Sequence, residues 1–73
     1  MAKEQILVDL GKQIRVVRKD KNLSQDEAAF KAGLARSYYG DIERGTRNVA
    51  AINLVHIARA LEVEVGDLFK GVK

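Results

Sequence analysis

Apolar residues recur at three- and four-residue spacing along most of the chain, which predicts helices with one buried face. The first such stretch runs through Leu7, Leu10, Ile14 and Val17. It should end near Asn22, because asparagine tolerates the left-handed conformation that commonly terminates a helix. No stretch alternates apolar and polar residues long enough to indicate a strand, and proline is absent. The pattern therefore predicts an all-α protein.

Two short helices joined by a tight turn are predicted next. Ser24 and Glu27 have the spacing of a capping box, in which each side chain satisfies an otherwise unpaired backbone donor, so a second helix should begin at about Ser24. Gly33 permits the positive φ of a turn between helices. A third helix is expected from about Ala35 to Arg44, with Gly45 in the usual C-terminal stop position. The segment therefore predicts a helix, a turn and a helix.

The rest of the chain predicts two more helices. Apolar residues at helical spacing define a fourth helix over residues 51–61. Val63 and Val65 are expected to cross over the core, and Asp67 to lie in the acidic first turn of a last short helix whose Leu68 and Phe69 close the core. The expected architecture is a single compact five-helix domain over residues 1–73.

The third helix carries the candidate chemistry, because the second helix of such a pair projects as a ridge that fits the DNA major groove. Tyr39 and Ile42 are expected to face inward. Arg36 is the best candidate for reading a base, since its guanidinium can donate two parallel bonds to guanine. Gly40 either lets the backbone approach DNA closely or relieves a clash with a neighbouring helix. The expected outward face is polar and comprises Arg36, Ser37, Gly40, Asp41 and Arg44.

Composition narrows the function classes further. The net charge of +3 permits a nucleic-acid partner. Without cysteine there is neither a disulfide framework nor a thiolate metal site, and the lone His56 lacks a second ligand nearby, so no metal is expected. No phosphate-cradling glycine loop is present, and we expect neither an enzyme nor a cofactor. No membrane span or signal peptide is visible, which favours a cytoplasmic protein.

The residues from Leu23 to Asn48 resemble the phage-repressor (Cro-like, Xre-like) helix-turn-helix family. The resemblance covers roughly Leu10 to Phe69, and its motifs are LSQDE over 23–27, AGLARSYY over 32–39, DIERG over 41–45 and RN over 47–48. Within the family, RSY over 36–38 together with IERG over 42–45 and RN is similar to controller proteins of restriction-modification genes. The resemblance implies a lambda-repressor-like fold and a transcriptional regulator that binds a pseudo-palindromic operator in double-stranded DNA as a homodimer.

The resemblance also implies the roles of the site residues. Gln25 would bind a backbone phosphate with the help of the helix N-terminus, the alternative being a surface glutamine without a partner. Arg47 is a second candidate for reading a base, whereas Arg44 could instead be a solvated side chain that favours the helix dipole. Asp41 either accepts from a cytosine amino group or repels wrong sequences and phosphates. The implied DNA contacts are Gln25, Arg36, Ser37, Tyr38, Arg44, Arg47 and Asn48.

Arg18 and Glu43 are assigned a supporting role by the same resemblance. They would pair across the first and third helices and orient the reading helix, the alternative being two unrelated solvated side chains. The sequence departs from the family at Ala35 and Ala50, where a helix cap is usual, and at Val49, where proline often stands. Those two helix starts should fray or be capped differently.

A widened apolar arc on the fourth helix, at Ile52 and Val55, predicts a dimer contact, the alternative being scattered surface apolar residues. Asp26 and Glu27 are candidates for contact with RNA polymerase, although capping and the helix dipole also explain them. The operator and the sign of regulation, activator or repressor, stay open. Two alternatives also stay open, namely another Xre-like repressor of phage or host genes and an antitoxin-like protein-interaction module.

Overall fold

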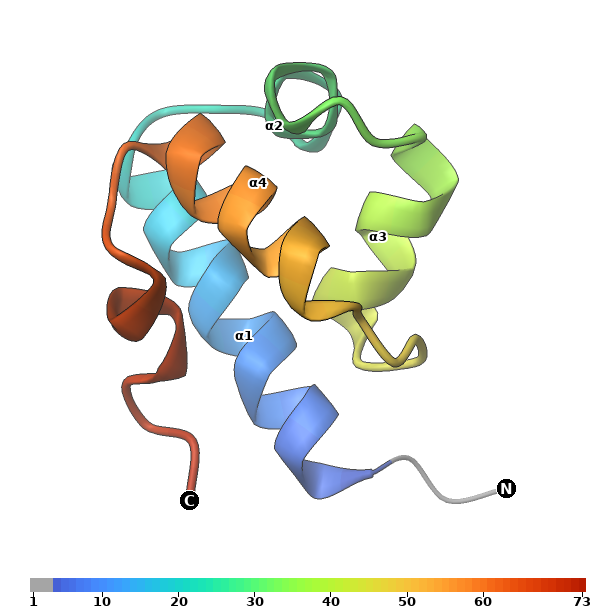
Figure 1. Ribbon diagram of the computed structural model, residues 1–73, viewed down its shortest axis with the longest axis vertical. Coiled ribbons are helices and arrows are strands. Elements are labelled where there is room, and N and C mark those ends of the chain that lie inside the picture. Colours follow the sequence, from blue (N-terminus) through green and yellow to red (C-terminus); the bar gives the residue numbers. More distant parts are fainter. Residues whose placement is uncertain (1–3) are drawn as a thin grey trace.

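A computed structural model describes residues 4–73, which form four α-helices and one 3-10 helix (Figure 1). They are α1 (Gln5–Asp20), α2 (Gln25–Ala32), α3 (Arg36–Arg44), α4 (Ala51–Leu61) and η1 (Val65–Phe69). Within residues 4–73, no helix combines the length and the hydropathy needed to cross a bilayer. The all-α architecture is confirmed, whereas the prediction of a fifth α-helix was wrong.

The last element is a 3-10 helix because it is too short to repay the cost of an α-helical nucleus. The Asp67 N–H donates to the Glu64 carbonyl at 3.0 Å, the tighter three-residue spacing. The Asp67 carboxylate in turn accepts from the Glu64 N–H at 3.1 Å. Adjacent residues of such a turn point in different directions, so Leu68 is fully buried while Phe69 is 40% exposed. The prediction that both would close the core was therefore wrong for Phe69.

Each of the four α-helices is followed within two residues by a residue in the left-handed conformation. Asn22 (φ 60°) and Gly33 (φ 71°) were predicted there, and Gly45 (φ 75°) takes the expected stop position. At each of these ends the following N–H bonds back across the last turn, as Leu34 does to the Ala29 carbonyl at 2.9 Å. Glu62 (φ 59°) ends α4 in the same way, although glutamate carries no sequence signal for this conformation.

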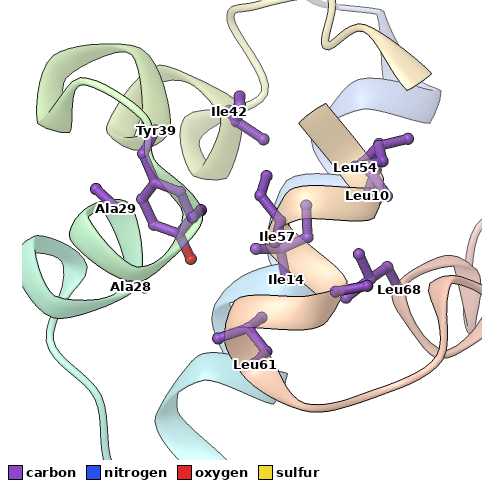
Figure 2. Packing of buried hydrophobic residues seen from close by; sticks show 12 residues of the cluster. Leu10, Ile14, Ala28, Ala29, Tyr39, Ile42, Leu54, Ile57, Leu61 and Leu68 are labelled. Atoms are coloured by element: carbon purple, nitrogen blue, oxygen red, sulfur yellow. The ribbon is translucent and has the colours of Figure 1, made fainter. Parts of the chain in front are cut away.

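The core lies where the five elements meet (Figure 2). Tyr39 and Ile42 project inward from α3, as predicted, and the Tyr39 ring lies over Ala28 and Ala29 of α2. The small alanines let α2 pack closely, so one aromatic ring fills the space between α2 and α3. The other large side chains that are fully buried are Ile14 from α1, Ile57 and Leu61 from α4, and Leu68 from η1.

The arrangement leaves α3 on an outer side of the molecule. Figure 1 shows α1 and α4 between α3 on one side and η1 on the other. In the same view α2 is seen almost along its axis while α3 runs down the picture, so the two helices cross steeply. The predicted helix-turn-helix is thus present, with one long face of its second helix uncovered by other elements.

A close backbone contact between α1 and α3 fixes the position of α3. A Cβ atom at Gly11 would lie 2.5 Å from the carbonyl oxygens of both Ile42 and Glu43. A Cβ atom at Gly45 would lie 2.7 Å from the Cα of Val8. The C-terminal turn of α3 therefore rests on the backbone of α1, and no side chain separates them. The role of Gly11 could not be predicted from the sequence, because a glycine within a helix does not show which element it faces.

We expect Gly11→Ala to lower the free energy of unfolding by about 1–3 kcal/mol, because the new methyl group meets backbone carbonyls that cannot rotate away. Gly66→Ala is the matched control, since nothing lies within 4 Å of a Cβ there. That change should stay within about 0.5 kcal/mol. Urea denaturation of both variants measures the difference, and equal stabilities would refute the proposed role of Gly11.

Candidate nucleic-acid interface

The exposed face of α3 begins with Arg36 and Ser37, which are both exposed to solvent. The Arg36 Nε forms an ion pair with the Asp26 carboxylate of α2. Both side chains are open to water, with 65% of Arg36 and 71% of Asp26 exposed. The candidate base reader is thus held toward α2 in the free protein by an exposed ion pair, a kind that is weak.

Asp41, in the middle of this face, binds two of the candidate DNA-contacting arginines. Its Oδ1 accepts from Arg44 Nη2 at 2.5 Å, and its Oδ2 lies 3.5 Å from Arg47 Nη2. These cations, Arg44 first and then Arg47, lower the pKa of the Asp41 carboxyl below its ordinary value. The sequence alternatives for Asp41 considered only DNA, whereas in the free protein this carboxylate organises cations on its own surface.

Tyr38 connects α3 to α4 and to the loop between them. Its hydroxyl accepts a hydrogen bond from Asn53 Nδ2 of α4 at 3.0 Å. The guanidinium carbon of Arg47 lies 5.4 Å from the centre of its ring, within cation–π range. Tyr38 is half-buried at the border of the exposed face. Its ring therefore positions Arg47 through the cation–π contact. Sequence reasoning missed Asn53, whose only signal is a polar residue beside the apolar stripe of α4.

Gly40 is buried, so its predicted outward position was wrong. A Cβ atom there would lie 3.2 Å from Arg44 Nη1, and no atom of a neighbouring helix is among its nearest contacts. The suggested clash with a neighbouring helix is therefore also wrong. The absence of a side chain at Gly40 makes room for Arg44 to fold back along its own helix toward Asp41.

A buried ion pair joins α1 to α3. Arg18 Nε donates to Glu43 Oε2 at 2.7 Å, and Arg18 Nη2 donates to Oε1 at 3.1 Å. The remaining Nη1 donates to the Leu23 carbonyl at 2.8 Å, in the turn before α2. Only 8% of the Arg18 side chain and 2% of the Glu43 side chain are exposed. The structure thus brings these two residues together with the parallel, two-bond geometry in which arginine binds carboxylates well.

Gln25 belongs to the same network. Its Nε2 donates to Glu43 Oε1 at 2.9 Å. The Ser24 N–H donates to Glu27 Oε1 at 2.8 Å and the Glu27 N–H donates to Ser24 Oγ at 3.1 Å, which confirms the capping box. These hydrogen bonds to Ser24 lower the pKa of Glu27. Gln25 is therefore fixed both by a well-capped helix start and by the buried carboxylate of α3.

The environment of Glu43 keeps it ionised. Burial alone would raise its pKa, but the hydrogen bonds from Arg18 and Gln25 outweigh burial and lower the pKa below its ordinary value. Burial, and next the Glu43 carboxylate, strongly raise the pKa of the neighbouring Tyr39 hydroxyl, so Tyr39 stays neutral. Arg18 and Glu43 therefore form a charged pair inside the fold, next to the C-terminal end of α3.

The remaining candidates lie apart from this network. Asn48 is exposed in the loop after α3, next to Arg47. On α4, Ile52 is 66% exposed and Val55 is half-buried, and both lie outside the core cluster. Ala35 and Ala50 provide no side-chain cap, although α3 and α4 begin directly after them. Apart from Gln25 on α2, the candidate DNA contacts thus lie on α3 and its following loop, while the apolar pair lies on α4.

Two features together are typical of a helix-turn-helix DNA-binding protein. The exposed helix α3 is held in place by a buried ion pair, and it follows the capped helix α2 after a tight turn. Comparisons with known proteins agree with this class. The model of the helix-turn-helix family matches residues 14–68. The chain therefore belongs to the helix-turn-helix family.

Individual relatives are also similar over most of the chain. Control protein C.BamHI of Bacillus amyloliquefaciens is 48% identical over 59 residues, covering 80% of this chain and 73% of that protein. Control protein C.MunI of a Mycoplasma species is 36% identical over 69 residues, covering 93% of each. Among solved structures, the restriction-modification controller protein C.AhdI from Aeromonas hydrophila superposes with a TM-score of 0.89 at 45% identity, covering 90% of this chain and all of that one.

Glu43→Ala should lower the free energy of unfolding by about 3–5 kcal/mol, because it leaves the Arg18 guanidinium buried without a partner. The pair also predicts a pH dependence. Since folding lowers the pKa of Glu43, its contribution is full well above the ordinary value of 4.5 and is lost as the pH falls through the folded value. Denaturant titrations between about pH 7 and 3 should therefore show a smaller acid-induced loss in Glu43→Gln than in the wild type.

The control is the double variant Arg18→Met with Glu43→Leu, which removes both charges. It should be more stable than Glu43→Ala, because no unpaired charge stays inside the fold. If the loss in free energy of unfolding in the double variant equals the sum of the losses in the two corresponding single variants, the two side chains do not stabilise each other.

Proposed function

We propose that this protein is a homodimeric transcriptional regulator that binds a pseudo-palindromic operator in the cytoplasm and controls restriction-modification genes. The observation that carries the proposal is the exposed face of α3, held on α1 by the Arg18–Glu43 pair. The names of the control proteins that share most of this chain support the choice of target genes.

In this proposal α3 enters the major groove and Arg36 donates two hydrogen bonds to a guanine. Asp26 must first release Arg36. An exposed ion pair is worth about 0–1 kcal/mol, whereas a two-bond arginine contact discriminates the right base by about 1–3 kcal/mol. The exchange is therefore favourable on the correct base, whereas on a wrong base the lost ion pair is not compensated. Asp26 would thereby suppress binding to wrong sequences.

The other candidates surround this contact. Gln25 would hold a backbone phosphate at the N-terminus of α2, where unpaired N–H groups and the helix dipole favour an anion. Arg47, placed by the Tyr38 ring and Asp41, would read a base at the groove edge or bind a phosphate. Further DNA contacts are assigned to Ser37, Tyr38, Arg44 and Asn48.

A second copy of the chain would bind through α4. Ile52 and Val55 lie outside the core, so their apolar surface is available to a partner. A two-fold dimer would place two copies of α3 about 34 Å apart, one helical turn of DNA, and so match a pseudo-palindromic operator.

The proposal includes a contact with RNA polymerase through the acidic start of α2. Asp26 and Glu27 are both exposed on α2. Glu27 already serves the capping box, so Asp26, once Arg36 has turned to DNA, is the better candidate for such a contact.

Arg36→Ala should reduce the preference for the operator over random duplex by about 10- to 100-fold, while much of the weak, salt-sensitive binding persists. Arg36→Lys keeps the charge but loses the two-bond geometry, so it should lose the same preference. Arg59→Ala is the control, because it removes an exposed arginine from α4.

The measurement is a titration of the purified proteins against DNA fragments from around their own gene at several salt concentrations. A wild type that binds no fragment better than random duplex would contradict sequence-specific regulation. Equal loss on all sequences in Arg36→Ala would instead make Arg36 a phosphate contact.

Ile52→Asp should convert the dimer to monomers, since it buries a carboxylate in an apolar contact. Val16→Asp is the matched control, because Val16 is 60% exposed on α1 rather than α4. Sedimentation of the three proteins at DNA-binding concentrations tests this, and a monomeric wild type would refute the dimer.

A further inference from the structure

A basic pocket lies between α1 and α3, outside the residues assigned to the interface from the sequence. Its volume is about 230 Å³, and its lining residues are Val8, Lys12, Arg15, Gln25, Glu43 and Arg44. Three of these carry a positive charge and one a negative charge. The pocket thus joins two cations of α1 to Gln25, the proposed phosphate contact.

The negative charge in the pocket is already neutralised. Glu43 accepts two hydrogen bonds from Arg18 and a third from Gln25, and its side chain is 2% exposed. Arg44 is paired with Asp41. The pocket wall is therefore polar, and within the described residues its cations without an ion-pair partner are those of α1.

Lys12 and Arg15 supply this charge. They lie three residues apart on α1, which places their side chains on neighbouring turns of one face. Both are exposed, and neither forms an ion pair with any residue from Glu4 onward. Asp9, one turn earlier, accepts a hydrogen bond from Gln5 at 2.8 Å. Two adjacent cations without a partner thus border the pocket.

The pocket also borders the proposed DNA-binding face. Arg44 is exposed at the end of α3, the helix that carries Arg36, and Gln25 is the first residue of α2. Exposed, flexible cations suit the backbone of a long polyanion, which passes across a surface, better than a small anion that must be enclosed.

We propose that Lys12 and Arg15 bind neighbouring DNA backbone phosphates beside Gln25. This inference rests on the proposed DNA-binding function and adds α1 to the interface. Because α1 also holds α3 through Gly11 and Arg18, a phosphate bound there would fix the height of the reading helix above the groove. Lys12 and Arg15 are thus positioning residues that carry no sequence information.

The test is the salt dependence of binding to a random-sequence 30-base-pair duplex. Each lost phosphate contact reduces the magnitude of the negative slope of log K against log salt by about 0.9 per bound chain. Lys12→Ala and Arg15→Ala should therefore each reduce it by this amount, and the double variant should reduce it by about twice as much. The ratio of operator to random-duplex affinity should stay within about twofold, unlike that of Arg36→Ala. Arg15→Lys should keep most of the wild-type slope.

Lys31→Ala and Arg59→Ala are the charge-matched controls, since neither residue lines this pocket. They should change the slope by less than half as much as their counterparts on α1. Equal changes in controls and pocket variants would overturn the inference and leave only the general effect of net charge. Binding of inorganic phosphate with an unchanged DNA slope would also overturn it, by assigning the pocket to a free anion. A wild type that binds no duplex would contradict the proposed function itself.

Discussion

The reading helix keeps its place because α1 has no side chain at Gly11. The carbonyls of Ile42 and Glu43 occupy the space that a Cβ atom would need, so the last turn of α3 rests directly on the α1 backbone. Backbone contacts have little freedom to relax, unlike contacts between long side chains. The direction in which α3 projects is therefore set sterically, and the polar interactions refine a position that packing has already fixed.

The Arg18–Glu43 pair completes this contact with a directional one. Its two parallel hydrogen bonds hold α3 against rotation about its own axis, and the third bond of Arg18 ties the turn before α2 to the same point. Gln25 then extends the network to the start of α2. A buried ion pair is weak evidence for stability, since desolvation offsets much of its attraction. Its value here lies in the geometry that it imposes on both helices of the motif.

The ion pairs on the exposed face of α3 differ from this buried pair, because water reaches them. Arg36, Arg44 and Arg47 each have a carboxylate partner, and more than half of each arginine side chain is open to water. Breaking such a pair costs little free energy. These pairs hold the arginines on this face of the free protein, and in the proposed complex the arginines would exchange these carboxylates for DNA. A helix that recognises a DNA sequence requires both a rigid attachment to the fold, which α1 provides for α3, and exposed side chains that can change partners.

The sequence by itself determined the four α-helices, the capping box at Ser24 and the inward direction of Tyr39 and Ile42, because these depend on spacing and on local hydrogen bonds between near neighbours. It also placed the candidate DNA contacts at the start of α2, on α3 and on the following loop. Only the tertiary structure decided that Gly11 admits the α3 backbone, that Gln25 bonds to Glu43 and that Asp26 and Asp41 hold the arginines. It also decided that Gly40 lies beneath Arg44 and that Phe69 stays partly exposed. These features depend on which faces of separate elements meet, and the spacing of residues along one chain does not contain that information.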